Sequence, residues 1–281
     1  MISMMIKALV SDLDGTLFKD HKETVLDLAQ KNIEGLEILK NNNISFHAAT
    51  GRAVGYGIAL LEKFHFDHVI ASGYNGSEIY DNGSIYRAPA LDKDLLYRIY
   101  QEVLKFLPII ETIQFQTDEA ERIFYDKNVE RVPRYRAEMK VFRVGTICDF
   151  TIDEMFEKHI DKNVLKITIS TFDEEKTNDL YMHLKNMFSD VSFVTLSHTT
   201  FIEICNKGYN KGTFIQYLID HYYKKEEIAV VGDALNDYDM FQKAGLKFAM
   251  NPGNKFLKQN ADYIVDSVAD AIAIILEKNG Q

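Results

Sequence analysis

The fold of this 281-residue chain follows from one stretch near its start, IKALVSDLDGT, residues 6–16. The first six residues are mostly apolar, and the run stops abruptly at Asp12, Asp14 and Gly15. A short apolar run ended by turn residues is typical of a buried strand in a parallel sheet. The two acids then lie at the carboxyl end of that strand, where open parallel sheets bind their ligands.

Two further apolar runs end in the same way. Residues 44–49 stop at Thr50-Gly51-Arg52, and residues 228–231 stop at the stretch GDALND, residues 232–237. Apolar residues at helical spacing lie between the strands. The expected helices are 24–40, one ending near 64, 211–222 and 268–278, with short strands at 68–71, 248–250 and 263–265. This alternation predicts an α/β fold, a Rossmann-like parallel sheet covered by helices on both faces.

The middle of the chain has a different pattern. Strands expected at 112–116, 121–125 and 165–170 alternate apolar and polar residues, which is typical of an antiparallel sheet with one solvated face. Helices are expected at 92–107, 129–140 and 173–188. No Pro-rich or Gly/Ser-rich linker separates this part from the rest. We therefore expect an α+β domain, residues 84–191, inserted into a core of residues 1–83 and 192–281, to which strands at 191–196 and 201–204 lead back.

Composition limits the classes of function. Hydrophobic residues make up 46% of the chain and charged residues 26%, enough for a sizeable core. The formal net charge of −10 argues against a nucleic-acid partner, which a basic face would have to hold. One basic cluster, expected to be a solvated helix face, contains Arg131, Arg134, Arg136 and Arg143. Phosphate chemistry must then rely on a metal and a few placed cations.

The sequence favours a cytoplasmic protein. Cys148 and Cys205 are far apart, which fits a reducing compartment. The start lacks the features of a signal peptide, and no apolar run approaches the roughly 18 residues of a membrane span. The natural start, at Met1, Met4 or Met5, stays open, and so does the oligomeric state.

The acids at the expected sheet edge predict a metal. Neighbouring carboxylates repel one another, and Mg²⁺ relieves this with a few carboxylates, waters and phosphate oxygens. Asp12 can then attack phosphorus as a nucleophile. Asp14 can protonate the leaving oxygen and later deprotonate the attacking water. Thr50 offers a hydroxyl and Lys211 a compact positive charge to the phosphate.

These signals differ in specificity. The four fixed positions of Asp-x-Asp-Gly-Thr recur by chance roughly once in 10⁵ windows. A calcium loop would need a third acid or amide before Gly15 and a later glutamate, so that alternative is disfavoured. Lys207 competes with Lys211 as the phosphate-binding lysine. We prefer Lys211 because Gly212 follows it and a helix begins there.

Together the clusters resemble the four motifs of the haloacid dehalogenase (HAD) superfamily, in its Cof-type sugar-phosphatase branch. The resemblance extends to Asn75-Gly76 and to Glu203-Ile204. It implies Asp12 as nucleophile and Asp14 as acid/base. The implied phosphate-binding residues are Thr50, Gly51, Lys211 and Asn236. The implied Mg²⁺ ligands are Asp12, the backbone carbonyl of Asp14 and Asp233, with Asp237 acting through the shell of the metal.

The position of the insertion refines the resemblance. The chain advances 36 positions between Asp14 and Thr50 but 161 between Thr50 and Lys211. A large cap after the second motif is similar to the Cof-type arrangement, in which the cap closes over the site and selects the substrate. Haloacid dehalogenases and phosphonatases of the family lack an aspartate two positions after the nucleophile, so Asp14 argues against both activities.

The expected function is therefore a Mg²⁺-dependent phosphatase that hydrolyses phosphomonoesters of small metabolites, sugar phosphates or similar, through an aspartyl-phosphate. One alternative is a phosphosugar mutase, which forms the same intermediate but returns the group to a sugar. Another is a catalytically silent regulator that binds a phosphorylated metabolite. The intact set of acids disfavours the regulator. The expected partner is a small phosphorylated metabolite, with neither nucleic acid nor membrane.

Overall fold

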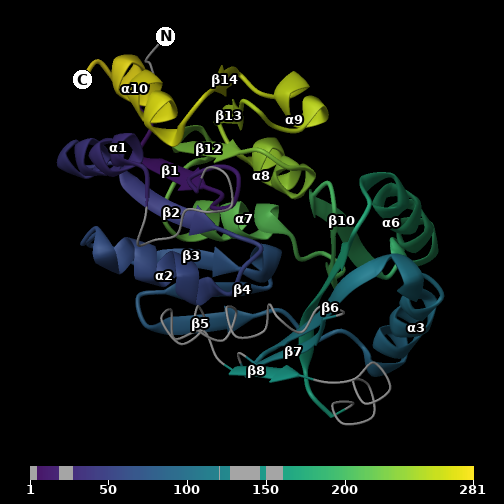
Figure 1. Cartoon of the computed structure of the whole chain (residues 1–281). Helices are drawn as coiled ribbons and strands as arrows, with labels where there is room; N and C mark the ends of the chain where they lie inside the picture. Colours follow the sequence, from purple (N-terminus) through teal and green to yellow (C-terminus); the bar gives the residue numbers. More distant parts are fainter. Residues whose placement is uncertain (1–4, 19–27, 120, 127–145, 150–160) are drawn as a thin grey trace. The chain divides into compact units, whose positions relative to one another are not determined.

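The computed structural model describes residues 5–18, 28–119, 121–126, 146–149 and 161–281 (Figure 1). The chain divides into two compact units, one of Met1–Tyr86 with Asn210–Gln281 and one of Arg87–Tyr209. Each unit is built around its own sheet.

The first unit contains an eight-stranded sheet in the order β14-β13-β12-β1-β2-β3-β4-β5. From β14 to β3 every neighbouring pair is parallel, and β4 runs antiparallel to β3. The predicted parallel sheet is thereby confirmed. The strands are β1 (Ala8–Ser11), β2 (Ser45–Ala49), β3 (Ile70–Gly73), β4 (Glu78–Asp81), β5 (Ser84–Arg87), β12 (Ile228–Gly232), β13 (Leu246–Met250) and β14 (Tyr263–Val265).

Helices cover both faces of this sheet. Ala49 packs in a buried cluster with Phe214 of α7 and Met240 of α8. The adjacent Ala48 points to the opposite face, where Gly57 of α2 approaches it closely. Right-handed crossovers place α1, between β1 and β2, on the face of α2. The helices are α1 (Gln30–Asn41), α2 (Val54–Lys63), α7 (Lys211–His221), α8 (Tyr238–Lys243), α9 (Lys255–Gln259) and α10 (Val268–Asn279).

The second unit contains a six-stranded sheet in the order β10-β11-β9-β6-β7-β8. Its pairs are antiparallel except β7 with β8, which is parallel. The expected α+β character is confirmed. The elements are α3 (Lys93–Leu104), β6 (Ile110–Thr117), β7 (Glu121–Asp126), β8 (Thr146–Asp149), β9 (Val164–Thr171), α6 (Glu174–Phe188), β10 (Ser192–His198) and β11 (Phe201–Asn206).

The expected solvated face is wrong for the centre of this second sheet. All of β9 is buried, including its polar residues Lys166, Thr168 and Ser170. These side chains pair across the strands: Lys166 with Glu203 in an ion pair, Gln116 with Thr168 at 3.0 Å. Buried polar groups are tolerated where they hydrogen-bond to one another.

The bounds of the units also differ from the expected insertion, residues 84–191. Strand β5 joins the first sheet, and β10 and β11 join the second through β9. The hairpin of β10 and β11 belongs to the sheet that contains its pairing partner, β9. The alternation of apolar and polar residues does not show which strand a hairpin will pair with. The role of the second unit as a substrate-selecting cap stays a prediction.

Several other expectations meet the structure differently. The helix expected from residue 24 begins at Gln30, and residues 24–27 lie outside the described part. The helix expected at 129–140 and the four arginines of the basic cluster also lie outside it. Among the described helices none is long and apolar enough to cross a membrane. Cys205 lies buried on β11.

His47 lies in the core of the first unit. It is fully buried on β2, with Nδ1 3.1 Å from the carbonyl oxygen of Ile70 and Nε2 3.1 Å from the hydroxyl of Tyr223. Burial lowers the pKa of His47 to about 4. The neutral imidazole is therefore the form that the folded core accommodates.

We expect His47 to make the fold less stable in mild acid. In the unfolded chain His47 binds a proton below its ordinary pKa of about 6.5, whereas in the native state it does so only near pH 4. The free energy of unfolding therefore falls as the pH is lowered from 6.5 toward 4. Between pH 7 and pH 5 the loss is about 2 kcal/mol. In the variant His47→Gln this position cannot titrate. Its free energy of unfolding in urea should therefore fall by about 2 kcal/mol less between pH 7 and pH 5 than that of the wild type. Equal losses in the two proteins would contradict the assignment.

Candidate active site

The candidate site begins with Asp12, directly after β1. Asp12 is buried, and its backbone N–H donates to the carbonyl oxygen of Val231 at 3.0 Å, which fixes it at the carboxyl edge of the sheet. The chain then turns at Gly15 with a φ of +81°, in the left-handed region that favours glycine. A Cβ on Gly15 would lie 2.6 Å from Asp233 Oδ2. Glycine thus allows the two acid-bearing loops to approach each other.

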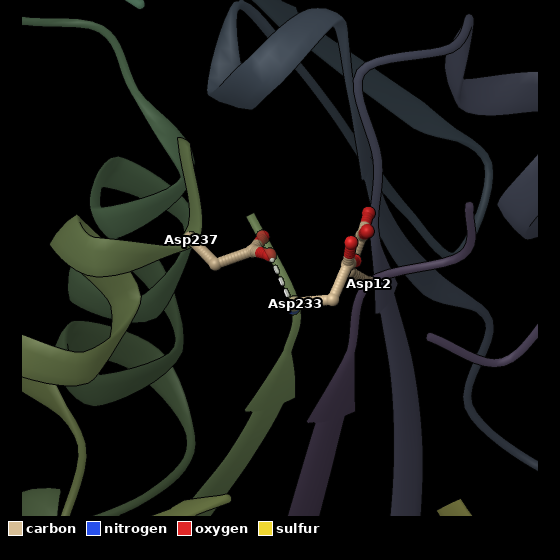
Figure 2. Close-up of side chains that lie close together, drawn as sticks. All are labelled: Asp12, Asp233 and Asp237. Atoms are coloured by element: carbon tan, nitrogen blue, oxygen red, sulfur yellow. Dashed lines mark hydrogen bonds between the residues drawn. The ribbon is translucent and has the colours of Figure 1, made fainter. Parts of the chain in front are cut away.

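Three carboxylates gather at this edge. Oxygens of Asp12, Asp233 and Asp237 all lie within 4.8 Å of one another; Figure 2 shows Asp12 and Asp233 just after β1 and β12 and Asp237 on the turn that leads into α8. The Thr16 hydroxyl donates to Asp233 Oδ1 at 2.8 Å. Asp237 Oδ2 accepts from the backbone N–H groups of Asp233 (2.9 Å, dashed in Figure 2) and Ala234 (3.0 Å). The three acids come from loops that the fold holds in place.

Lys211 is the cation of this cluster. It is the first residue of α7 and 1% exposed, and its Nζ donates to Asp12 Oδ1 and to Asp237 Oδ1, both at 2.6 Å. The competing Lys207 is exposed, belongs to the second unit and donates to the carbonyl oxygen of Asp190. The geometry therefore brings Lys211, and not Lys207, to the nucleophile expected from the sequence.

The charges of the cluster do not balance. Burial raises the pKa of Asp12 well above its usual value, against the effect of Lys211, and Asp237 and Asp233 add to the rise. Burial and then Asp237 raise the pKa of Asp233 to about 7. Burial acts to lower the pKa of Lys211, but Asp12 and Asp237 outweigh it and the net shift is upward. One ammonium among three crowded carboxylates leaves an excess of negative charge.

This donor set fits a divalent cation. Magnesium prefers one or two carboxylates with waters and phosphate oxygens, and a positive ion would relieve the repulsion that, after burial, adds to the raised pKa values of Asp12 and Asp233. Asp12 and Asp233 have the chemistry of direct ligands. Both oxygens of Asp237 already accept hydrogen bonds. Asp237 is thus better suited to orient the cluster than to bind an ion alone.

Asp14 is not one of the three clustered carboxylates. Arg52 Nε donates to its Oδ2 at 2.7 Å, and the Arg52 Nη2 contacts the other oxygen. The guanidinium also lies 4.9 Å from the ring centre of Tyr56, a cation–π contact. In this arrangement the expected acid/base residue is held by Arg52. To act on a substrate, its carboxyl group must change partner.

The expected phosphate-binding residues lie on neighbouring loops. Thr50 is buried just after β2, the neighbour of β1, and Gly51 follows it. The Thr50 hydroxyl accepts the backbone N–H of Arg52 at 3.0 Å. Asn236 is buried in the loop after β12 and donates from Nδ2 to Asn75 Oδ1 at 3.2 Å. Their roles at a phosphate stay predictions.

Sequence reasoning missed three contacts of this site. Thr16 stands in the first motif, but its hydrogen bond to Asp233 was not predicted. Arg52 stands in the second motif, yet its pairing with Asp14 joins residues 38 positions apart. The resemblance includes Asn75 but gives it no role. In each case the motif marked the residue, and only the fold identified its partner.

Comparisons with known proteins agree with the geometry. The sequence profile of the haloacid dehalogenase-like hydrolases matches residues 9–276. The protein MG265 of Mycoplasma genitalium, whose name gives phosphatase as its expected activity, is 27% identical over 273 residues, 94% of each chain. The 5-amino-6-(5-phospho-D-ribitylamino)uracil phosphatase YwtE of Bacillus subtilis is 25% identical over 280 residues, 93% of each chain.

A solved haloacid dehalogenase-like hydrolase from Bacteroides thetaiotaomicron has a TM-score of 0.73 at 25% identity, over 96% of this chain and 99% of that chain. The predicted fold, a parallel α/β core with an inserted α+β domain, is confirmed. The family profile spans both units and all four motifs. The chain therefore belongs to the haloacid dehalogenase-like hydrolases and is an enzyme, a phosphatase of that family.

Proposed function

We propose that this phosphatase hydrolyses phosphomonoesters of small metabolites, sugar phosphates or similar, with Mg²⁺ as its cofactor and an aspartyl-phosphate on Asp12 as its intermediate. The observation that carries the proposal is the cluster of Asp12, Asp233 and Asp237, in which the buried Lys211 ammonium donates to Asp12 and Asp237. It combines a nucleophile, a fixed positive charge and a set of metal donors at one sheet edge.

The residues that would hold Mg²⁺ are Asp12, Asp233 and the backbone carbonyl of Asp14, with Asp237 acting through the shell of the ion. When bound, the ion neutralises negative charge and polarises the phosphoryl oxygens. The support for magnesium is the all-oxygen donor set, together with the raised pKa of Asp12 and of Asp233.

The remaining steps belong to the residues of the chain. A carboxylate oxygen of Asp12 attacks phosphorus, and the bond from phosphorus to the ester oxygen breaks while Asp14 gives that oxygen a proton. Water, losing a proton to Asp14, then attacks the aspartyl-phosphate, and inorganic phosphate leaves with Asp12 restored. Lys211 keeps Asp12 oriented and offers its positive charge to the phosphoryl group, and Thr50 and Asn236 bind phosphoryl oxygens. Catalysis of this kind is mostly positioning and charge stabilisation.

The substrate class rests on similarity. The name of YwtE specifies a phosphate ester on a ribityl chain. We extend to this chain only the general class, a phosphate on a small polyhydroxylated metabolite, and assign its selection to the second unit. The net charge of −10 and the spacing of the cysteines support a cytoplasmic enzyme without a nucleic-acid partner.

The test of the proposal is release of inorganic phosphate. With Mg²⁺ the enzyme should release phosphate from an aryl phosphate and from members of a panel of phosphorylated sugars and related metabolites. Interconversion of hexose phosphates without phosphate release would instead support the mutase. Binding of these esters without any turnover would support the silent regulator.

Asp12→Asn should lower turnover by at least about 10³-fold, because the amide cannot attack phosphorus while the shape of the side chain is kept. The variant should melt no earlier than the wild type, since it removes one of three crowded negative charges. Asp220→Asn, the same replacement at an exposed position of α7, is the matched control and should keep full activity. Turnover unchanged by Asp12→Asn would refute the mechanism.

Removal of metal should abolish activity, and Mg²⁺ should restore it. A second readout is independent of turnover: saturating Mg²⁺ at about 100 times its Kd should stabilise the fold by about 2.7 kcal/mol. Differential scanning calorimetry should show this as a higher Tm. Asp233→Asn should lose most of the Tm shift, whereas Asp220→Asn should keep it. A metal-free enzyme that retains activity and shows no Tm shift would exclude the cofactor.

A further inference from the structure

A buried left-handed turn follows β3 in the first unit. Its residues Tyr74, Asn75 and Gly76 have φ values of 47°, 55° and 89°, and all three are buried. A non-glycine residue in this region costs roughly 1–2 kcal/mol. Such strain persists where surrounding contacts enforce it, and it clusters at functional sites. The proposed function gives this turn no role.

The turn is bonded to the loop that carries Thr50. The backbone N–H of Asn75 donates to the carbonyl oxygen of Thr50 at 3.1 Å, and that of Tyr74 donates to the carbonyl oxygen of Arg52 at 2.8 Å. Both hydrogen bonds go to the same loop, residues 50–52. The path of the Thr50 loop is thus fixed by this turn.

The same turn contacts the loop after β12. Asn75 Oδ1 accepts one N–H of the Asn236 amide at 3.2 Å. Both side chains are buried, and the Asn236 Oδ1 has no hydrogen-bond partner among the described residues. The Asn236 amide is therefore held from one side, through Asn75.

A third contact reaches the start of α7. A Cβ on Gly76 would overlap the carbonyl oxygen of Asn210, the residue just before Lys211. Glycine is required there both by this approach and by its left-handed φ. One three-residue turn thus touches the loops of Thr50, Lys211 and Asn236.

From these contacts we propose that Asn75 is a positioning residue, which orients the Asn236 amide and, with its turn, aligns the three phosphate-binding loops. This inference rests on the proposed function, in which Thr50, Lys211 and Asn236 bind the phosphoryl group. Because phosphoryl transfer depends on placement of the groups around phosphorus, a loosened amide should cost rate and phosphate affinity even when the fold is intact.

Asn75→Gly is the most direct test, since glycine keeps the left-handed backbone and its N–H but deletes the amide. With an aryl phosphate and Mg²⁺ we expect kcat/KM to fall by about 10- to 100-fold and the inhibition constant of inorganic phosphate to rise about tenfold. Asn43→Gly is the matched control: Asn43 is also left-handed, with φ 57°, but exposed after α1, and its variant should match the wild type.

A double-mutant cycle with Asn236→Ala separates positioning from general loosening. If Asn75 acts through Asn236, Asn75→Gly adds little to the loss already caused by Asn236→Ala. Losses that multiply independently, or an Asn75→Gly enzyme with wild-type kinetics, would overturn the proposal. If Asn75→Gly melts well below the wild-type Tm, Asn75→Ala replaces it in the same cycle, because alanine also deletes the acceptor of the Asn236 amide and leaves the unfolded chain less flexible than glycine does. A wild type that releases no phosphate from any ester refutes instead the proposed function.

Discussion

The Lys211 ammonium, buried between Asp12 and Asp237, is the interaction on which the site depends. Its two hydrogen bonds of 2.6 Å connect the first strand of the chain to the loop after β12, with Lys211 itself at the start of α7. A buried charge is stable only when it is paired. Here the pairing is incomplete, because Asp233 adds a third carboxylate. Burial raises the pKa of Asp12 and the neighbouring carboxylates add to the rise, and the excess negative charge makes the site suitable for a divalent cation.

The parallel sheet makes this crowding possible, and this part could be predicted from the sequence. Strands β1 and β12 are neighbours in register, Ser11 opposite Val231, so the residues after each strand meet although 221 positions separate Asp12 from Asp233. Continuous apolar runs that end at acids and glycines reveal such strands. The close approach of the loops also explains why glycine stands at position 232, since a Cβ there would lie 2.6 Å from the carboxylate of Asp237.

The features that the sequence did not predict depend on which strands, far apart in the chain, pair with each other. Lys166 alternates with isoleucine along β9 and therefore looks like a solvated residue, but it is buried in an ion pair with Glu203 of β11. Because β11 pairs with β9 and β10 pairs with β11, both strands belong to the second sheet. The boundary between the two units therefore differs from the expected one. Periodicity reports that one face is polar. It does not show whether the polar side chains of that face hydrogen-bond to water or to other side chains.

In the proposed mechanism the nucleophile and the acid/base residue need opposite properties. The nucleophile and the phosphate-binding residues must stay fixed, and Asp12, Thr50, Lys211 and Asn236 are all buried, each hydrogen-bonded to another loop. The acid/base residue must instead exchange a proton first with the leaving group and then with water. The Asp14 side chain is 28% exposed against 7% for Asp12, and its partner Arg52 is 23% exposed. Water therefore reaches the ion pair of Asp14 and Arg52 more readily than that of Asp12 and Lys211. Of the two motif aspartates, Asp14 is thus the one that can change partner without disturbing the buried cluster.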